Sequence, residues 1–281
     1  MALKNNLPSK EQVDNLIKIA LNEDIGSGDI TTRSIVSTDD MFAAEVLTRD
    51  NIILCGLDIL KSVFFKLDPD VIFVDNCFND GDEINSNTKI LGIKGKGIPL
   101  LEGERVALNI LQRLCGIATL TKEYVKRAGH IQILDTRKTN PGLRLFEKYA
   151  VSCGGGKNHR FGLYDAVLIK DNHIKASGGI TQAVYKVKKK YKDIQVEVEA
   201  SNLEEVKEAI EAKVDIIMLD NMSVENIKKA VHIINGRASI EVSGSISIDQ
   251  LEQLSQINID CVSIGSLTHS SKASDISMNF I

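Results

Sequence analysis

The sequence of 281 residues has no low-complexity tract and no hydrophobic run long enough to cross a membrane. A membrane-spanning helix needs about 18 or more consecutive apolar residues, so no transmembrane segment is expected. Residues 1–12 are polar and lack the apolar stretch of a signal peptide. We therefore expect a cytoplasmic protein.

Neither sign of charge dominates the chain. It has 34 Lys and Arg residues against 38 Asp and Glu residues, which gives a net charge of −4. This balance argues against general binding to nucleic acid or to an anionic membrane. A basic pocket confined to one site is compatible with it.

Cysteine pairs with a recognisable spacing are also missing. The five cysteines are odd in number and widely separated, and no two have the spacing of a zinc site or a redox motif. They are Cys55, Cys77, Cys115, Cys153 and Cys261. The sequence therefore predicts reduced thiols in a reducing cytosol.

The first half of the chain mixes helical and strand-like patterns. Ser9 and Gln12 form a capping-box pair ahead of apolar residues at helical spacing from Val13 to Leu21. A long helix is expected from Glu104 to Val125. Strands are expected over 42–48, 71–74 and 88–96, and a helix over 57–67. These patterns predict an N-terminal α/β sandwich.

After Gly129, apolar runs of strand length alternate with helical segments. This alternation is typical of a parallel sheet covered by helices. The strands are expected over 131–134, 166–169, 194–198, 215–219, 239–242 and 261–264, and the clearest helices over 202–212, 223–234 and 247–255. An incomplete α/β barrel of six to seven parallel strands is therefore predicted. The expected domains are the sandwich at 1–115, the barrel at 116–270 and a tail at 271–281 that packs on the sandwich.

Polar residues follow each expected strand of the second half. They include the runs 135–138, 170–173, 220–221, 243–245 and 265–266, while Glu197 and Glu199 lie in the third strand. Active sites of α/β barrels lie at the C-terminal ends of the strands. These ends therefore predict the position of the site.

Cations are dense between residues 135 and 173. Guanidinium groups bind carboxylate and phosphate in a bidentate way, and lysine adds a point charge. A solvated basic face is the common alternative, but the position of these cations at strand ends favours an anion pocket. The intervening turn Gly154–Gly156 lets the backbone approach a ligand or take positive φ, or else acts as a hinge.

Two further features suggest a phosphorylated substrate. Glu199 and Asp220 end successive strands, so they are candidate magnesium ligands or partners of pocket cations. The small-residue loops Ser243–Ser245 and Gly265–Ser266 are either phosphate cradles with free N–H groups or ordinary strand-to-helix turns.

The run DTRKTNPGLR at 135–144 and the run GGGKNHR at 154–160 resemble the signature of quinolinate phosphoribosyltransferases, also called nicotinate-nucleotide pyrophosphorylases (carboxylating). The similarity covers nearly the whole chain. Further matching segments lie at 23–32, 103–105, 147–150, 170–173, 196–199 and 218–222, together with Asn109.

The resemblance implies a decarboxylating transfer of phosphoribosyl from phosphoribosyl pyrophosphate to quinolinate. The products are nicotinate mononucleotide, pyrophosphate and carbon dioxide, in de novo NAD biosynthesis. The resemblance also implies Mg²⁺ as the cofactor and a homodimer or larger homo-oligomer. It agrees with the sandwich and barrel expected from the pattern of elements.

The resemblance also implies roles for individual residues. Catalysis is expected from Lys138, Glu199 and Asp220, with the two acids around the metal. Quinolinate is expected to contact Thr136, Arg137, Lys138, His159, Arg160 and Lys170, with Arg105 reaching in from a partner subunit. Phosphoribosyl pyrophosphate is expected to contact Lys138, Lys170, Glu199, Asp220, Ser243, Gly244, Ser245, Gly265 and Ser266.

One position departs from the family pattern. Ser245 stands where the family typically has glycine, and serine tolerates positive φ poorly. Phosphate binding at this loop is therefore expected to be weaker or differently shaped.

Three other functions compete with this interpretation. They are a Schiff-base aldolase using Lys138 or Lys170, an anion-binding protein without catalysis, and a molybdate-associated paralogue on the same fold. The intact runs 158–160 and 170–173 argue against the paralogue. An aldolase leaves the other cations unexplained.

Overall fold

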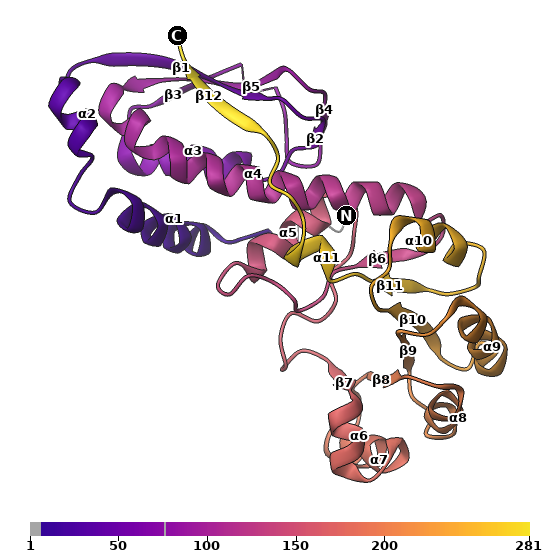
Figure 1. The fold of residues 1–281 in the computed structure, drawn as a ribbon. Coiled ribbons are helices and arrows are strands. Elements are labelled where there is room, and N and C mark those ends of the chain that lie inside the picture. Colours follow the sequence, from indigo (N-terminus) through magenta and orange to yellow (C-terminus); the bar gives the residue numbers. More distant parts are fainter. Residues whose placement is uncertain (1–6, 76) are drawn as a thin grey trace. The chain divides into compact units, whose positions relative to one another are not determined.

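The computed structural model describes residues 7–75 and 77–281, and these form two compact units. The first unit comprises the described residues up to Lys122 together with Leu145–Gly155 and Ser271–Ile281, and the second comprises Glu123–Arg144 and Gly156–Ser270. Strands and helices occur in both units (Figure 1). The structure is therefore of the α/β class that the sequence predicts.

An antiparallel sheet organises the first unit. Its strand order is β12-β1-β5-β3, with bounds Ile276–Phe280, Met41–Thr48, Thr88–Lys96 and Ile72–Val74. Ala44, Val46 and Thr48 of β1 are buried, because alternate residues of a strand point to the same face. A two-residue ladder joins β2 (Ile52–Ile53) and β4 (Glu83–Ile84).

The last strand of the chain completes this sheet. β12 pairs with β1 in antiparallel register, with Val46 opposite Met278. Helix α4 (Gly97–Arg127) holds the approach to β12, because the Gln112 amide donates to the Ile276 carbonyl at 2.6 Å and the Arg113 guanidinium donates to the Ser271 carbonyl at 2.9 Å. Residues 271–281 are therefore an integral part of the first unit.

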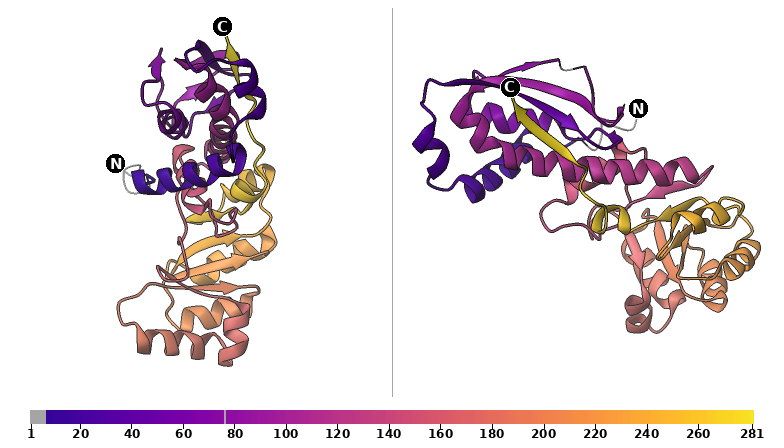
Figure 2. Two further views of the ribbon diagram at one scale, coloured as in Figure 1. Left: turned by 90° about the vertical axis from the view of Figure 1, so that its left-hand side faces the viewer. Right: turned by 45° about the horizontal axis from the view of Figure 1, so that its top comes forward.

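Helices α3 (Leu57–Leu67) and α4 cover one face of the sheet (Figures 1 and 2). The capping box of Ser9 and Gln12 is confirmed at the start of α1 (Lys10–Ile25), and α3 has its expected bounds. The expected start of α4 at Glu104 is wrong, because the helix already begins at Gly97. Pro99 fits this first turn, where a helix does not need its N–H group. The sequence did not predict α2 (Ile30–Ile35) or α5 (Arg144–Cys153).

The second unit contains a parallel sheet of six strands. Its order is β6-β11-β10-β9-β8-β7, so each strand pairs with its neighbour in sequence except that β6 pairs with β11 instead of β7. The bounds are Gln132–Leu134, Cys261–Ser263, Ser239–Ser243, Ile216–Asp220, Val196–Ala200 and Val167–Ile169. The sheet is therefore an incomplete barrel that is open between β6 and β7, as expected.

Helices cover the outer side of this sheet (Figures 1 and 2). The expected helices correspond to α8 (Leu203–Glu211), α9 (Val224–Ile234) and α10 (Ile248–Leu254). Their N-cap residues Asn202, Ser223 and Ser247 each accept a backbone N–H three residues on. The sequence did not predict α6 (Asp171–Ser177), α7 (Ile180–Lys190) or the short α11 (Ser266–His269).

The longest helix, α4, carries charged residues along its 31-residue length. Among the described residues, no helix combines the length and the apolar character that a bilayer crossing requires.

Candidate active site

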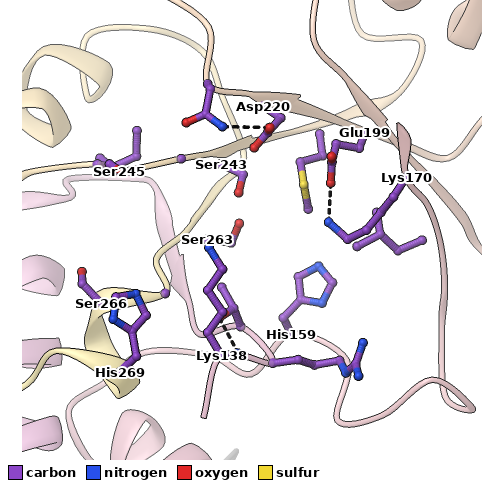
Figure 3. Close-up of a pocket in the computed structure, with 18 of the residues that line it drawn as sticks. Lys138, His159, Lys170, Glu199, Asp220, Ser243, Ser245, Ser263, Ser266 and His269 are labelled. Carbon is purple, nitrogen blue, oxygen red and sulfur yellow. Dashed lines mark hydrogen bonds and ion pairs between the residues drawn. The ribbon is translucent and has the colours of Figure 1, made fainter. Parts of the chain in front are cut away.

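A pocket of about 720 Å³ lies at the carboxyl ends of the parallel strands (Figure 3). The structure brings every expected site residue of the second unit to its wall. They are Thr136, Arg137, Lys138, His159, Arg160, Lys170, Glu199, Asp220, Ser243, Gly244, Ser245, Gly265 and Ser266. Four cationic side chains and two carboxylates thus face one space, which suits a ligand with several negative charges.

Lys138 is held by backbone contacts after β6. Its N–H donates to the Thr136 hydroxyl at 3.0 Å, and its carbonyl accepts the Thr268 hydroxyl at 2.8 Å. A Cβ atom at Gly265 would lie 2.9 Å from Cδ of Lys138, so glycine there lets the lysine side chain pass. The amine can therefore reach the pocket (Figure 3).

The loop that carries His159 and Arg160 is fastened to β6. The Lys157 N–H donates to the Ile133 carbonyl at 2.8 Å, and the fully buried Asp135 accepts the His159 N–H at 3.0 Å. Asp135 also accepts the side-chain amide of Asn158 at 2.5 Å. Asp135, which ends β6, therefore fixes this loop.

The three glycines ahead of this loop do not line the pocket. A Cβ atom at Gly154 would lie 2.4 Å from the Ala118 carbonyl oxygen, and Gly155 has φ +89°. Gly154 is therefore needed for packing against α4, and Gly155 for a left-handed turn. The expected positive φ is confirmed at Gly155, whereas none of the three glycines lines the pocket.

Two arginines, Arg137 and Arg160, line the pocket and affect each other. Burial and the neighbouring Arg137 lower the pKa of Arg160. The Nε atom of Arg137 is buried and has no hydrogen-bond partner among the described residues. A buried cationic donor without a partner is costly unless an anion binds it.

Glu199 and Asp220 share one face of the sheet. Glu199 of β8 is in register with Met218 of β9, and Asp220 lies two residues beyond Met218 on the same side. Lys170 forms an ion pair with Glu199, and the Asn221 amide donates to Asp220 at 2.8 Å. Two carboxylates with room for water and phosphate oxygens fit magnesium, a hard cation that keeps several waters.

The loop after β10 differs from the expectation at Ser245. The positive φ of this loop, +143°, belongs to Gly244, whereas Ser245 is not among the described residues with positive φ. A Cβ atom at Gly244 would lie 2.8 Å from Oδ1 of Asn221. The backbone argument for a perturbed phosphate loop at Ser245 is therefore wrong.

The two small-residue loops meet their helices differently. Gly265 is the N-cap of α11, whereas the helix after Ser243–Ser245 is capped by Ser247. Free N–H groups from Gly244 to Ile246 therefore come from a loop ahead of the helix. Both loops line the same end of the pocket, with Ser266 and His269 near Lys138 (Figure 3).

Arg105 lies outside this pocket. It belongs to α4 in the first unit, its side chain is 60% exposed, and its guanidinium lies 3.7 Å from the Glu104 carboxylate. Within one chain the pocket is therefore lined without Arg105.

Sequence analysis missed Ser263 on the inner wall of the pocket and the acid Glu241 behind it. Ser263 lines the pocket, and Glu241 is a buried acid on the neighbouring strand. Burial and the nearby Glu197 raise the pKa of Glu241 to about 7. A charged residue inside an otherwise apolar strand was the available signal for Glu241.

Comparison with known proteins gives a consistent result over almost the whole chain. The family model for the quinolinate phosphoribosyl transferase N-terminal domain matches residues 29–115, and the model for the C-terminal domain of the same family matches residues 117–279.

Individual relatives agree with the family models. A probable nicotinate-nucleotide pyrophosphorylase (carboxylating) from Bacillus subtilis is 41% identical, over 95% of this chain and 93% of that protein. A mitochondrial quinolinate phosphoribosyltransferase (decarboxylating) from Nicotiana tabacum is 40% identical, over 94% of this chain and 80% of that protein. The solved nicotinate-nucleotide pyrophosphorylase from Francisella tularensis superposes with a TM-score of 0.93 at 42% identity, covering 98% of each chain.

Proposed function

The chain belongs to the quinolinate phosphoribosyltransferase family, and we propose that the pocket of its second unit is where quinolinate and phosphoribosyl pyrophosphate react. The enzyme transfers phosphoribosyl to quinolinate and releases pyrophosphate and carbon dioxide, giving nicotinate mononucleotide for NAD biosynthesis. The Schiff-base aldolase, the binding protein and the molybdate-associated paralogue find no support in the named relatives.

The buried, unpartnered Nε of Arg137 is the observation that carries the assignment of the quinolinate subsite. Quinolinate has two adjacent carboxylates, so it can satisfy Arg137 and Arg160 together. Thr136 and His159 line the same wall, and Lys138 and Lys170 supply further positive charge.

Phosphoribosyl pyrophosphate is assigned to the opposite part of the pocket. Glu199 and Asp220 would hold Mg²⁺, partly through water, and the bound ion would neutralise the pyrophosphate. The backbone N–H groups around Gly244 and Gly265, with Ser243, Ser245 and Ser266, would bind the 5′-phosphate. Lys170 forms an ion pair with Glu199, so its ammonium lies close to the proposed site of the pyrophosphate.

The chemistry follows from this arrangement. The ring nitrogen of quinolinate attacks the anomeric carbon, and the bond to pyrophosphate breaks. The developing positive charge on the ribose is stabilised by the carboxylate of Glu199, and the leaving pyrophosphate by Lys138 and Lys170. The ring nitrogen becomes cationic on ribosylation, so it stabilises the carbanion that remains when carbon dioxide departs. This carbanion then takes up a proton from solvent to give nicotinate mononucleotide.

The cysteines are consistent with a cytoplasmic enzyme, since all five are free thiols in the structure. We also propose that the enzyme is a homodimer or larger homo-oligomer in which Arg105 enters the pocket of a partner subunit. The exposed guanidinium of Arg105 on α4 supports this assignment.

The decisive test of the function is whether pyrophosphate release requires quinolinate, phosphoribosyl pyrophosphate and magnesium together. Lys138→Ala should abolish release. Lys229→Ala is the matched control, because Lys229 pairs with Glu225 on the exposed side of α9 and should leave activity unchanged. Release without quinolinate, or full activity of Lys138→Ala, would refute the assignment.

A complementation experiment tests the shared site. Arg105→Ala and Lys138→Ala should each be inactive as homo-oligomers. After subunit exchange, a mixed dimer contains one pocket with both residues intact, so part of the activity should return. If the mixture stays inactive although mixed dimers form, Arg105 does not act in a partner's pocket.

A further inference from the structure

Three ionisable side chains meet behind the wall of the pocket. Glu197 of β8 and Glu241 of β10 have 5% and 2% of their surface exposed, and both face the imidazole of His159. The Nε2 atom of His159 lies 3.2 Å from Oε2 of Glu197 and 3.7 Å from Oε1 of Glu241. His159 lines the pocket, whereas Glu197 and Glu241 lie within the barrel sheet and have no role in the chemistry described above.

The other ring nitrogen of His159 has a different partner. Nδ1 accepts a hydrogen bond from the backbone N–H of Arg160 at 2.8 Å. A backbone N–H can only donate, so Nδ1 carries no proton and the ring proton is on Nε2. The imidazole is therefore neutral, and its single N–H points at the buried carboxylates.

The cluster could either bind a metal ion or form hydrogen bonds among its own side chains, and the tautomer of His159 decides between the two. The potential ligand atoms of His159, Glu197 and Glu241 lie within 4.8 Å of one another, as in a metal site. Metal binding at Nε2 would require the proton on Nδ1, where it would face the Arg160 N–H. The donor pattern of the ring thus excludes a metal at Nε2 and leaves a hydrogen bond to Glu197.

The contacts of Glu197 and Glu241 also suit a neutral imidazole at His159. Oε1 of Glu241 is buried without a hydrogen-bond partner among the described residues, and Oε2 accepts from the Cys261 thiol at 3.6 Å. Two buried carboxylates close together are costly if both are charged. A proton on Glu241 removes this repulsion and leaves the Glu197 carboxylate to accept the His159 N–H.

We propose that Glu197, with Glu241 beside it, is a positioning residue that fixes His159 and, through it, aims Arg160 at the substrate carboxylates. The inference rests on the proposed function and deepens it, because it names the groups that orient Arg160 towards the substrate. Arg160 is held at two points, its backbone N–H by His159 and its guanidinium by the Ala166 carbonyl at 3.1 Å.

Replacing Glu197 separates this role from a general loss of structure. Glu197→Leu keeps a similar volume but removes the acceptor, and should raise KM for quinolinate about tenfold, with KM for phosphoribosyl pyrophosphate within about twofold. Glu197→Gln keeps an acceptor and should restore KM for quinolinate to within about threefold of the wild type. Glu45→Leu, which removes an ion-paired acid from β1 in the first unit, should change neither constant.

Nitrogen NMR on histidine-labelled wild-type protein reads the ring directly, whether or not Glu197→Leu folds. The signal that disappears in His159→Gln should show a neutral ring protonated at Nε2. A cationic ring, or an Nδ1–H tautomer, would overturn the proposal. So would an unchanged KM for quinolinate in Glu197→Leu, or an equal rise in both KM values. Lack of any turnover by the wild type would refute the proposed function, while the NMR result would still decide the role of Glu197.

Discussion

Replacing Glu241 with Gln should change how the stability of the protein depends on pH. The pKa of this acid is raised from its ordinary value of 4.5 to about 7, first by burial and then by the charge of Glu197. Cys261 also faces the carboxyl group, at 3.6 Å. Between pH 4.5 and about 7 the folded protein keeps a proton that the unfolded chain has lost.

The sign and size of the effect follow from this difference. Unfolding releases a proton in that window, so the contribution of Glu241 to the free energy of unfolding falls as pH rises. The gap between 4.5 and about 7, at about 1.36 kcal/mol per pH unit, corresponds to about 3 kcal/mol. Glu241→Gln cannot ionise, so its stability relative to the wild type should rise by about this amount from pH 4.5 to pH 8.

Urea unfolding at a series of pH values measures this difference. Far-ultraviolet circular dichroism is the suitable signal, because the chain contains no tryptophan. Titrating groups away from the cluster are common to both proteins, so their contributions cancel in the comparison. Parallel stability curves for the two proteins across this range would show that Glu241 ionises normally in the folded state.

Three predictions concern the substrates. Nicotinate should react with kcat/KM about a hundredfold below quinolinate, because one carboxylate cannot pair with both the buried Nε of Arg137 and the guanidinium of Arg160. Comparable turnover of both acids would contradict the subsite. Chelating magnesium should abolish turnover, and Asp220→Ala should raise KM for phosphoribosyl pyrophosphate about tenfold with little effect on quinolinate binding, measured by calorimetry. Gly244→Ala should raise KM for phosphoribosyl pyrophosphate about tenfold, because Gly244 has positive φ and lies close to the side-chain oxygen of Asn221. Ser245→Gly should change the same KM less than twofold, and equal effects of the two variants would contradict the loop geometry.

Local sequence patterns were sufficient for most of the barrel. Its strands are short runs rich in apolar residues, with acids such as Glu197 and Glu241 as exceptions. Polar residues at the ends of these runs located the pocket, since parallel strands bring their ends to one edge. Helices α8, α9 and α10 were predictable because each has an N-cap residue ahead of an apolar face. Such signals depend only on neighbouring residues.

Features that depend on distant contacts were not predictable in this way. Helix α5 contains polar motif residues whose burial is created by tertiary packing, as when Arg113 pairs with the fully buried Glu147. The positive φ at Gly244 instead of Ser245 depends on the approach of Asn221 from the next strand. The tautomer of His159 depends on which groups the fold places at each ring nitrogen.

The pairing of β12 with β1 has a consequence for synthesis of the chain. A ribosome synthesises β1 early and β12 only after all six strands of the barrel. Until then one edge of β1 has free backbone groups, and such an edge can pair with another nascent chain. A premature stop codon shortly before Ile276 would therefore spare every strand that carries the pocket and yet leave the other unit prone to aggregation.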